Sequence, residues 1–150
     1  RIIVGEVRGP EAFDMMQAMN PGHEGSLTPV HANSPRDALA RIENMVLMAG
    51  FDLPARAIRE QMASAFHLII HLARFADGSR RILNVSEVVG MEEATVTMQD
   101  IFTFETRSIA EDGRIVGELE TSGIVPTFAD RFTKAGVPLE SILPNVARWA

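Results

Sequence analysis

The first nine residues hold the feature that most constrains the fold: a run of β-branched aliphatic residues that leads to a glutamate and a glycine turn. Ile2, Ile3 and Val4 form the apolar run, Glu6 follows it, and Gly9 marks the turn. A continuous apolar run is typical of a strand buried on both faces of a parallel sheet. Because such sheets bind ligands at the carboxyl ends of their strands, we expect Glu6 to lie at a binding edge.

A carboxylate at this edge has a specific chemical use. It can orient the water shell of a Mg²⁺ ion or polarise a water that attacks a phosphoryl group. Glu6 is therefore the first candidate catalytic and metal-binding residue, with Mg²⁺ held through water. Two structural roles stay open, since Glu6 could instead cap the next helix or pair with Arg8.

The sequence carries no complete nucleotide site. The phosphate loop G-x-x-x-x-G-K-[ST] does not occur in the 150 residues, although it supplies the backbone cradle for phosphates in many ATPases. We therefore interpret the chain as the C-terminal part of a longer protein.

Composition excludes several classes of protein. The net charge of −6 argues against a nucleic-acid surface, which needs clustered Lys and Arg. The absence of cysteine excludes disulfides and thiolate metal sites and fits a reducing cytoplasm. No apolar run reaches the ~18 residues of a membrane span. With 46% apolar and 23% charged residues, the composition is that of a globular protein.

The residues after Gly9 predict a crossover to a second, parallel strand. We expect a helix over residues 10–19 and a strand over residues 26–32. Pro29 cannot donate to a ladder, so it should sit at an edge or a bulge. His31 ends this strand, and because consecutive strands usually lie close together, it should face the same crevice as Glu6. An imidazole there could bind a terminal phosphate, although a lone histidine is often structural.

A polar turn, residues 22–26, leads into this second strand. It follows a helix and lacks lysine, so it does not match a phosphate loop. We interpret it as a mobile lid or a simple connection.

Two further helices should follow. Ser34 at the N-cap and Pro35 at N1 predict a helix that ends at Gly50. Its inner face should carry Leu39, Ile42, Met45, Val46, Met48 and Ala49. A third helix is expected from residue 53 or 54 to residue 65.

The second half of the chain predicts antiparallel strands and a helical tail. Two β-rich runs, residues 66–75 and 80–89, flank Asp77-Gly78 and should form a hairpin. The remaining expected elements are strands over residues 95–98, 101–106 and 115–119, the last after an Asp112-Gly113 turn, and a helix over residues 127–134. The fold class is therefore α/β, with an antiparallel β extension and a small helical tail. We place the domain boundary between residues 1–125 and residues 126–150.

His67 and His71 have the spacing of a zinc-binding pair on a helix. Here they fall in an expected strand, where four residues span about 13 Å. The glutamate of an H-E-x-x-H motif is also missing. The sequence therefore argues against a zinc site.

Longer motifs carry a family resemblance that covers nearly the whole chain. They occupy residues 1–12 (RIIVGEVRGPEA), 19–41 (MNPGHEGSLTPVHANSPRDALAR), 45–50, 53–61, 87–92, 99–105 and 123–128. On these motifs the chain resembles the CpaF/TadA-type ATPases of tight-adherence (Flp) pilus assembly, members of the type II/IV secretion ATPase superfamily. It has Pro21 and Pro29 in stretches where such proteins commonly carry Thr.

The resemblance implies the C-terminal part of a RecA-like P-loop ATPase core that uses ATP and Mg²⁺. It implies that residues 5–8 are the Walker B segment, with Glu6 acting on the Mg²⁺ shell and the hydrolytic water. It implies that His31 belongs to the His box, a γ-phosphate sensor, and that Arg8 contacts the edge of the nucleotide. The phosphate loop and the acidic box would lie upstream of Arg1.

The resemblance also implies partners and a location. We expect a cytoplasmic homo-oligomer, a hexamer, that is peripheral at the inner membrane. It should move pilin subunits through platform proteins and bind no nucleic acid. The chain alone should hydrolyse ATP poorly. Two alternatives stay open: a type IV secretion ATPase that exports effectors or DNA, and a non-enzymatic assembly module.

Overall fold

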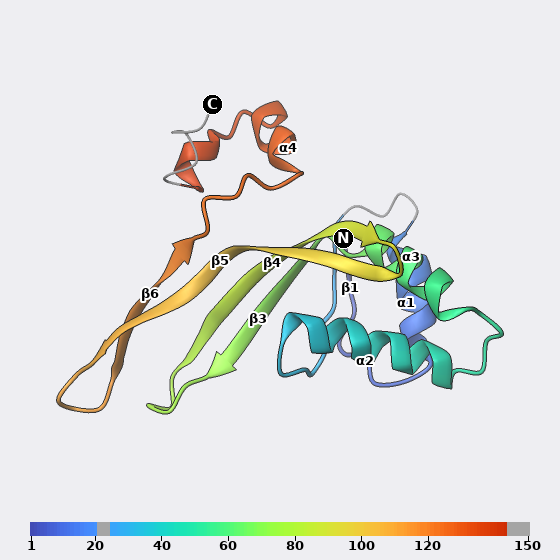
Figure 1. Ribbon diagram of the computed structural model, residues 1–150, viewed down its shortest axis with the longest axis horizontal. Helices are drawn as coiled ribbons and strands as arrows, with labels where there is room; N and C mark the ends of the chain where they lie inside the picture. The colour runs from blue at the N-terminus through green and yellow to red at the C-terminus, as the bar shows by residue number, and fades with distance from the viewer. Residues whose placement is uncertain (21–24, 144–150) are drawn as a thin grey trace. The chain divides into compact units, whose positions relative to one another are not determined.

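The computed structural model describes residues 1–20 and 25–143. Its elements are, in order, β1 (Ile2–Ile3), α1 (Glu11–Met19), β2 (Ser26–Leu27), α2 (Pro35–Met48), α3 (Ala55–Ala65), β3 (Leu68–Arg74), β4 (Arg80–Glu92), β5 (Thr95–Ile109), β6 (Ile115–Thr121), α4 (Ala129–Lys134) and a 3₁₀ turn (Leu139–Ser141). The strands form a parallel pair, β1 with β2, and a four-stranded sheet in the order β3-β4-β5-β6 (Figure 1). This confirms the predicted α/β class with an antiparallel extension.

The chain separates into two compact units. One consists of residues 1–67 and 88–98, and the other of residues 68–87 together with the chain from residue 99 onward. Strands β4 and β5 each contribute residues to both units. The boundary that we place between residues 125 and 126 stays a prediction.

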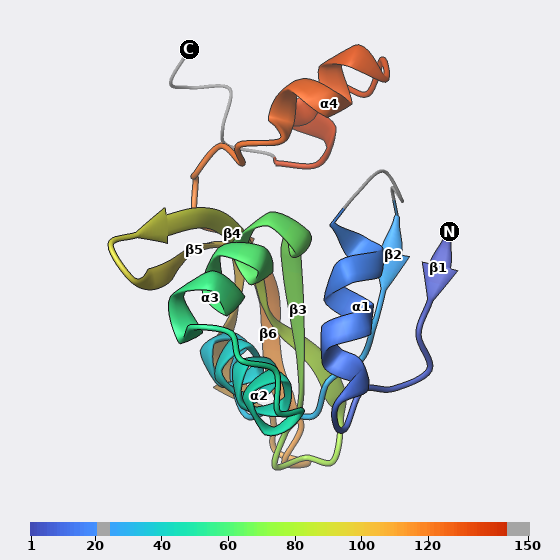
Figure 2. The same cartoon turned by 90° about the vertical axis from the view of Figure 1, so that its right-hand side faces the viewer.

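Three helices build the core of the first unit. Helices α1, α2 and α3 contact one another (Figure 2). Their buried side chains follow the helical period and include Ala12, Met15, Met16, Leu39, Ile42, Met45, Val46, Ile58, Met62 and Ala65. Burial of a Leu, Ile, Val or Met side chain stabilises a fold by about 1.5–3 kcal/mol, so this apolar face, and not intrinsic propensity, holds the helices in place.

The start of α2 has the predicted cap. Ser34 is extended and its Oγ accepts a hydrogen bond from the Asp37 N–H at 3.0 Å, with Pro35 in the first turn. The helix is followed by Gly50 at φ +79°, a conformation that favours glycine. Met48, expected on the inner face, is 85% exposed. The prediction was wrong because each three-residue step turns back by about 60° on an α-helix. Met48, three residues after Met45, therefore lies beyond the edge of the stripe that contains Ile42 and Val46.

The parallel pair is shorter than predicted. Ile2 pairs with Ser26 and Ile3 with Leu27, and the Val4 N–H donates to the Leu27 carbonyl at 2.9 Å. The parallel direction is confirmed, but neither strand extends to its expected end at Glu6 or His31. Burial on both faces was also wrong for this strand, since Ile3 is 75% exposed. Within the described residues β1 has a ladder only with β2.

The β3–β4 hairpin forms as predicted, with antiparallel pairing from Leu68–Glu87 to Arg74–Arg80. His71 lies in β3 and His67 precedes it. The described residues contain no group of three or more His, Cys, Asp or Glu side chains suited to a metal ion.

Strand β5 is continuous, whereas the sequence predicted two strands with a break at Gln99 and Asp100. Both polar side chains find partners on β4, so the backbone stays extended through them. Gln99 Nε2 donates to Glu87 at 2.7 Å, and Ser86 Oγ lies 2.5 Å from Asp100 Oδ1. Cross-strand pairs of this kind stabilise a sheet.

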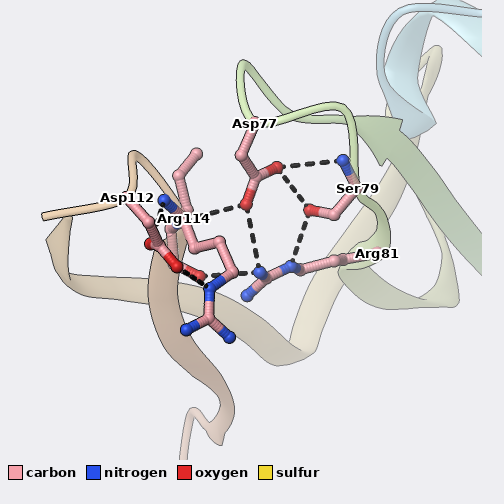
Figure 3. Close-up of polar contacts among 6 residues, drawn as sticks. Asp77, Ser79, Arg81, Asp112 and Arg114 are labelled. Atoms are coloured by element: carbon pink, nitrogen blue, oxygen red, sulfur yellow. Dashed lines mark hydrogen bonds and ion pairs between the residues drawn. The ribbon is translucent and has the colours of Figure 1, made fainter. Parts of the chain in front are cut away.

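The turns of the two hairpins in the second unit are joined by a polar network (Figure 3). Asp77 accepts hydrogen bonds from the Ser79 N–H at 2.9 Å, the Ser79 hydroxyl at 2.6 Å and the Ile115 N–H at 2.9 Å. Arg81 donates to the Ile115 carbonyl at 2.6 Å and to Asp77 at 3.4 Å. Its guanidinium also lies 5.2 Å from the ring centre of Phe104, a cation–π distance. The β3–β4 turn is thus fixed to the start of β6.

The chain after β6 packs on the sheet of its own unit through one buried carboxylate. Glu87 is 1% exposed and accepts from the Thr127 N–H at 2.9 Å, the Thr127 hydroxyl and Gln99. Ile101 and Leu143 form a small core beside Phe102, Phe128, Leu139 and Ile142.

Helix α4 starts two residues later than predicted. Among the described residues, none of the helices has both the length and the apolarity needed to span a membrane.

Candidate functional site

Glu6 and His31 meet although they follow different strands. The Oε1 atom of Glu6 lies 2.8 Å from the Nε2 atom of His31. The register explains the contact, because β1 and β2 run parallel with Ile3 opposite Leu27. The segments that follow β1 and β2 leave the strand pair in the same direction. Glu6 and His31 therefore lie beyond the same end of the pair. The predicted convergence of these two side chains is therefore observed.

Arg8 completes the group. Its Nη2 atom lies 2.7 Å from Glu6 Oε2. One oxygen of the carboxylate therefore faces the Arg8 guanidinium and the other faces the His31 imidazole. The side chain of Glu6 is 29% exposed, whereas those of Arg8 and His31 are 71% and 77% exposed. The carboxylate is thus partly enclosed between two groups that reach into solvent. Of the two structural alternatives for Glu6, pairing with Arg8 occurs, whereas the N-cap of α1, Pro10, has no side-chain cap.

The electrostatics favour an ionised carboxylate. A hydrogen bond from Arg8 holds the pKa of Glu6 below its usual value, partial burial opposes that shift, and the charges of Arg8 and His31 add to it. The same contact raises the pKa of Arg8. At neutral pH Glu6 therefore carries a negative charge and can accept hydrogen bonds.

The backbone on both sides of the group is fixed by helix starts. After Arg8, the carboxylate of Glu11 accepts hydrogen bonds from the N–H groups of Arg8 at 2.8 Å and Gly9 at 3.1 Å. After His31, Ser34 caps α2. Sequence reasoning identified Ser34 but missed Glu11. The signal was present, since an acid in the first turn of a helix commonly binds free N–H groups there.

The donor set fits the chemistry of a phosphate ester with a divalent cation. Carboxylate oxygen is a ligand type that Mg²⁺ prefers, directly or through water. An exposed guanidinium and an imidazole are hydrogen-bond donors suited to phosphate oxygens. Arg8 pairs with Glu6 Oε2, whereas Glu6 Oε1 is buried beside His31 without a hydrogen bond and could accept one from a water of a Mg²⁺ ion. Glu6, Arg8 and His31 therefore fit the Mg²⁺ ion and the nucleotide phosphate that the sequence implies.

The expected lid lies mostly outside the described residues, since residues 21–24 are not among them. Gly25 is described and has φ +85°, in the region that favours glycine. Pro21 likewise lies outside the described part. The role of residues 22–26 stays a prediction.

Comparison with known proteins yields a consistent family. A family model described as "Type II/IV secretion system protein" matches residues 1–117. The putative conjugal transfer protein Rv3659c of Mycobacterium tuberculosis is 35% identical over 120 residues, which are 79% of this chain and 33% of that protein. The conjugal transfer protein TrbB of Rhizobium radiobacter is 37% identical over 92 residues, 61% of this chain and 26% of that protein.

A solved structure shares the architecture. The crystal structure of the VirB11 ATPase from the Brucella suis type IV secretion system, in complex with sulphate, matches with a TM-score of 0.53 and 35% identity, covering 57% of this chain and 26% of that one. The chain thus spans about a third or less of the length of these relatives. The expected RecA-like ATPase architecture agrees with this match. Because the family model covers 117 of the 150 residues, the chain belongs to the type II/IV secretion system protein family.

Proposed function

We propose that this chain is the part of an ATP-hydrolysing secretion motor that starts at the Walker B segment. The observation that carries the proposal is the 2.8 Å contact between Glu6 and His31. It brings a carboxylate and an imidazole to one end of a parallel strand pair, where α/β folds bind their ligands. Membership of the type II/IV secretion system protein family supports the same reading.

Glu6 is the proposed catalytic residue. When bound, Mg²⁺ neutralises charge that develops on the transferring phosphoryl group. Glu6 orients the water shell of that ion or the attacking water. Both tasks require the ionised carboxylate, and the Arg8 contact that lowers the pKa of Glu6 keeps it in that form.

His31 and Arg8 are the proposed phosphate contacts. Both are largely exposed, at 77% and 71%, and already lie beside the acid. A terminal phosphate that accepts hydrogen bonds from either group would weaken its hold on Glu6. The site would then couple phosphate binding to release of the carboxylate, with catalysis by positioning and charge neutralisation.

The other half of the nucleotide site must come from elsewhere in the protein. No phosphate-loop motif occurs in these 150 residues, so the lysine and the backbone cradle would be supplied upstream of Arg1. The chain alone should therefore bind and hydrolyse ATP poorly.

The proposed work of the motor is assembly of a Flp-type pilus. This assignment rests on the motifs shared with CpaF/TadA-type ATPases, such as GEVRGPEA at residues 5–12. In that role the protein would act in the cytoplasm as a homo-hexamer, peripheral at the inner membrane, and move pilin subunits through platform proteins.

Export through a type IV secretion machine is the second candidate. The relatives carry names of conjugal transfer and type IV secretion proteins, and these names favour it. Hydrolysis would be the same in both cases. Pilin genes beside the gene for this protein, or a pilus platform protein that co-purifies with it, would favour pilus assembly. Genes for conjugal transfer proteins beside this gene, or conjugal transfer proteins that co-purify with the protein, would favour export.

The proposed ATPase activity is tested with Glu6→Gln in the full-length protein. The amide keeps the shape of the side chain but cannot act as a carboxylate, so turnover should fall by about 10²- to 10⁴-fold while ATP still binds. Glu111→Gln, an exposed acid in the β5–β6 turn, is the matched control and should hydrolyse ATP normally. If Glu6→Gln turns over at the wild-type rate with intact binding, a non-enzymatic assembly role is the better account.

A further inference from the structure

We propose that Glu11 is a positioning residue for this site, acting through the backbone of the Arg8-Gly9 turn. The inference rests on the proposed function, because the position of Arg8 and Glu6 affects turnover only if Glu6 takes part in the reaction. Among the described residues, Glu11 makes no hydrogen bond or ion pair with Glu6 or His31. Its effect passes through the chain that carries them.

The starting point is the backbone between β1 and α1. The strand ends at Ile3 and the helix starts at Glu11. Between them, the Val4 N–H donates to the Leu27 carbonyl, and the carbonyls of Gly9 and Pro10 accept from the N–H groups of Ala12 and Phe13. The N–H groups of Arg8 and Gly9 lie at the surface, where a carboxylate competes with water as their acceptor. Both donate to a single atom, Glu11 Oε1, at 2.8 and 3.1 Å.

Glu11 is suited to this task by its place in the helix. Pro10 occupies the N-cap and has no side-chain cap, so the helix start lacks the usual Ser, Thr, Asp or Asn. The Glu11 carboxylate reaches back to the preceding N–H groups, as the acid of a capping box does. These backbone hydrogen bonds, the one from Arg8 foremost, hold the pKa of Glu11 below its usual value.

Gly9 leaves room for this contact. A Cβ atom at position 9 would lie 3.2 Å from Glu11 Oε2, which is tighter than ordinary van der Waals contact. The Ala12 N–H donates to the Gly9 carbonyl at 3.0 Å and closes the turn into α1. The turn is therefore shaped around the Glu11 carboxylate.

Arg8 is bracketed by two fixed points. On one side Val7 is 1% exposed and anchored in the core, and on the other Glu11 binds the backbone. The side chain of Arg8 is 71% exposed, so packing contributes little to its direction, and the backbone sets where it starts. Arg8 in turn holds Glu6 Oε2 at 2.7 Å. Loss of the Glu11 contact should loosen the whole chain of contacts from Gly9 to Glu6.

The test uses three variants of the full-length protein. Glu11→Ala should lower kcat for ATP hydrolysis about 10-fold, a change of about 1.4 kcal/mol in the barrier, with KM and the affinity for ATP nearly unchanged. Glu11→Gln should restore most of kcat because its amide oxygen accepts the same two hydrogen bonds. Asp14→Ala removes an exposed acid one turn along the same helix and should leave kcat unchanged. If Glu11 had a purely structural role, Glu11→Ala would lower thermal stability but would not produce this pattern of loss and rescue in kcat.

Hydrogen–deuterium exchange provides a readout independent of turnover. In Glu11→Ala the peptide covering residues 4–12 should take up about two more deuterons at early times, from Arg8 and Gly9, and Glu11→Gln should resemble the wild type. Unchanged exchange in Glu11→Ala would overturn the turn contact. Faster exchange with wild-type kcat would overturn the positioning role, and so would an equal loss of kcat in Glu11→Ala and Glu11→Gln. If Glu6→Gln also keeps full turnover, the proposed function itself has failed.

Discussion

The Nε2 atom of His31 lies 2.8 Å from the Oε1 atom of Glu6, and the parallel register of β1 and β2 accounts for that contact. Two residues of ladder on each strand are enough to align the segments that follow. Glu6 keeps its second oxygen on Arg8 at 2.7 Å. The functional account follows from this three-residue group, whose central carboxylate lies between two groups that can also bind phosphate.

Arg8→Ala should move the acid limb of the pH–rate profile to higher pH. Arg8 lowers the pKa of Glu6, so its removal lets that pKa rise, and the active carboxylate is then protonated at a higher pH as the pH falls. The measurement is kcat/KM of the full-length protein across the acidic range. Arg56→Ala, which removes an exposed arginine of α3 paired with Glu60, is the control. An acid limb that stays in place would show that Arg8 does not tune the reacting group.

Ser34→Ala should destabilise the protein by about 1 kcal/mol, because the Asp37 N–H loses its cap at the start of α2. Ser34→Asp supplies another capping oxygen and should remain near the wild type. Urea unfolding followed by circular dichroism measures both. Equal stability of Ser34→Ala and the wild type would contradict the role of the cap.

Glu87→Ala should cost about 3 kcal/mol of unfolding free energy. Its carboxylate is buried, and its removal leaves the Thr127 N–H and the Gln99 amide without their acceptor. Glu87→Gln keeps an acceptor and should lose less. Glu92→Ala removes an exposed acid from the same strand and should be almost neutral. A loss for Glu87→Ala no larger than that for Glu92→Ala would contradict the anchoring role.

Asp77→Asn should flatten the acid dependence of stability. Hydrogen bonds from the Ser79 hydroxyl and the Ile115 and Ser79 N–H groups lower the pKa of Asp77 to about 2. A depressed carboxyl pKa adds stability that is present above the unfolded pKa of about 3.9 and is lost as the pH falls toward the folded value. The melting temperature of the wild type should therefore fall more steeply than that of the variant between about pH 4 and pH 2. Parallel curves would assign the acid sensitivity to other groups.

Local signals in the sequence predicted the elements that depend on local chemistry. Ser34-Pro35 defined the start of α2, Asp77-Gly78 the first hairpin and Asp112-Gly113 the second. These features depend on backbone geometry that a few neighbouring residues decide. The meeting of Glu6 and His31 was predictable for a different reason, since parallel consecutive strands place their ends together.

The missed features depend on residues far apart in the chain. The continuity of β5 relies on pairs from Gln99 and Asp100 to β4, and the buried state of Glu87 relies on Thr127. Periodicity carries no information about such partners. The exposure of Ile3 likewise depends on what packs against that face of β1, which its own apolar character does not reveal.

The central claim is that Glu6 and His31 act together on one chemical step, and a double-mutant cycle on kcat of the full-length protein tests it most directly. His31→Ala alone should slow hydrolysis by about 10- to 100-fold, with ATP binding changed less. Residues that act as a unit are not additive, so adding His31→Ala to Glu6→Gln should slow turnover no further, within about 3-fold. If the two losses multiply in the double variant, or if His31→Ala hydrolyses ATP at the wild-type rate, the two residues do not share a step and the account is contradicted.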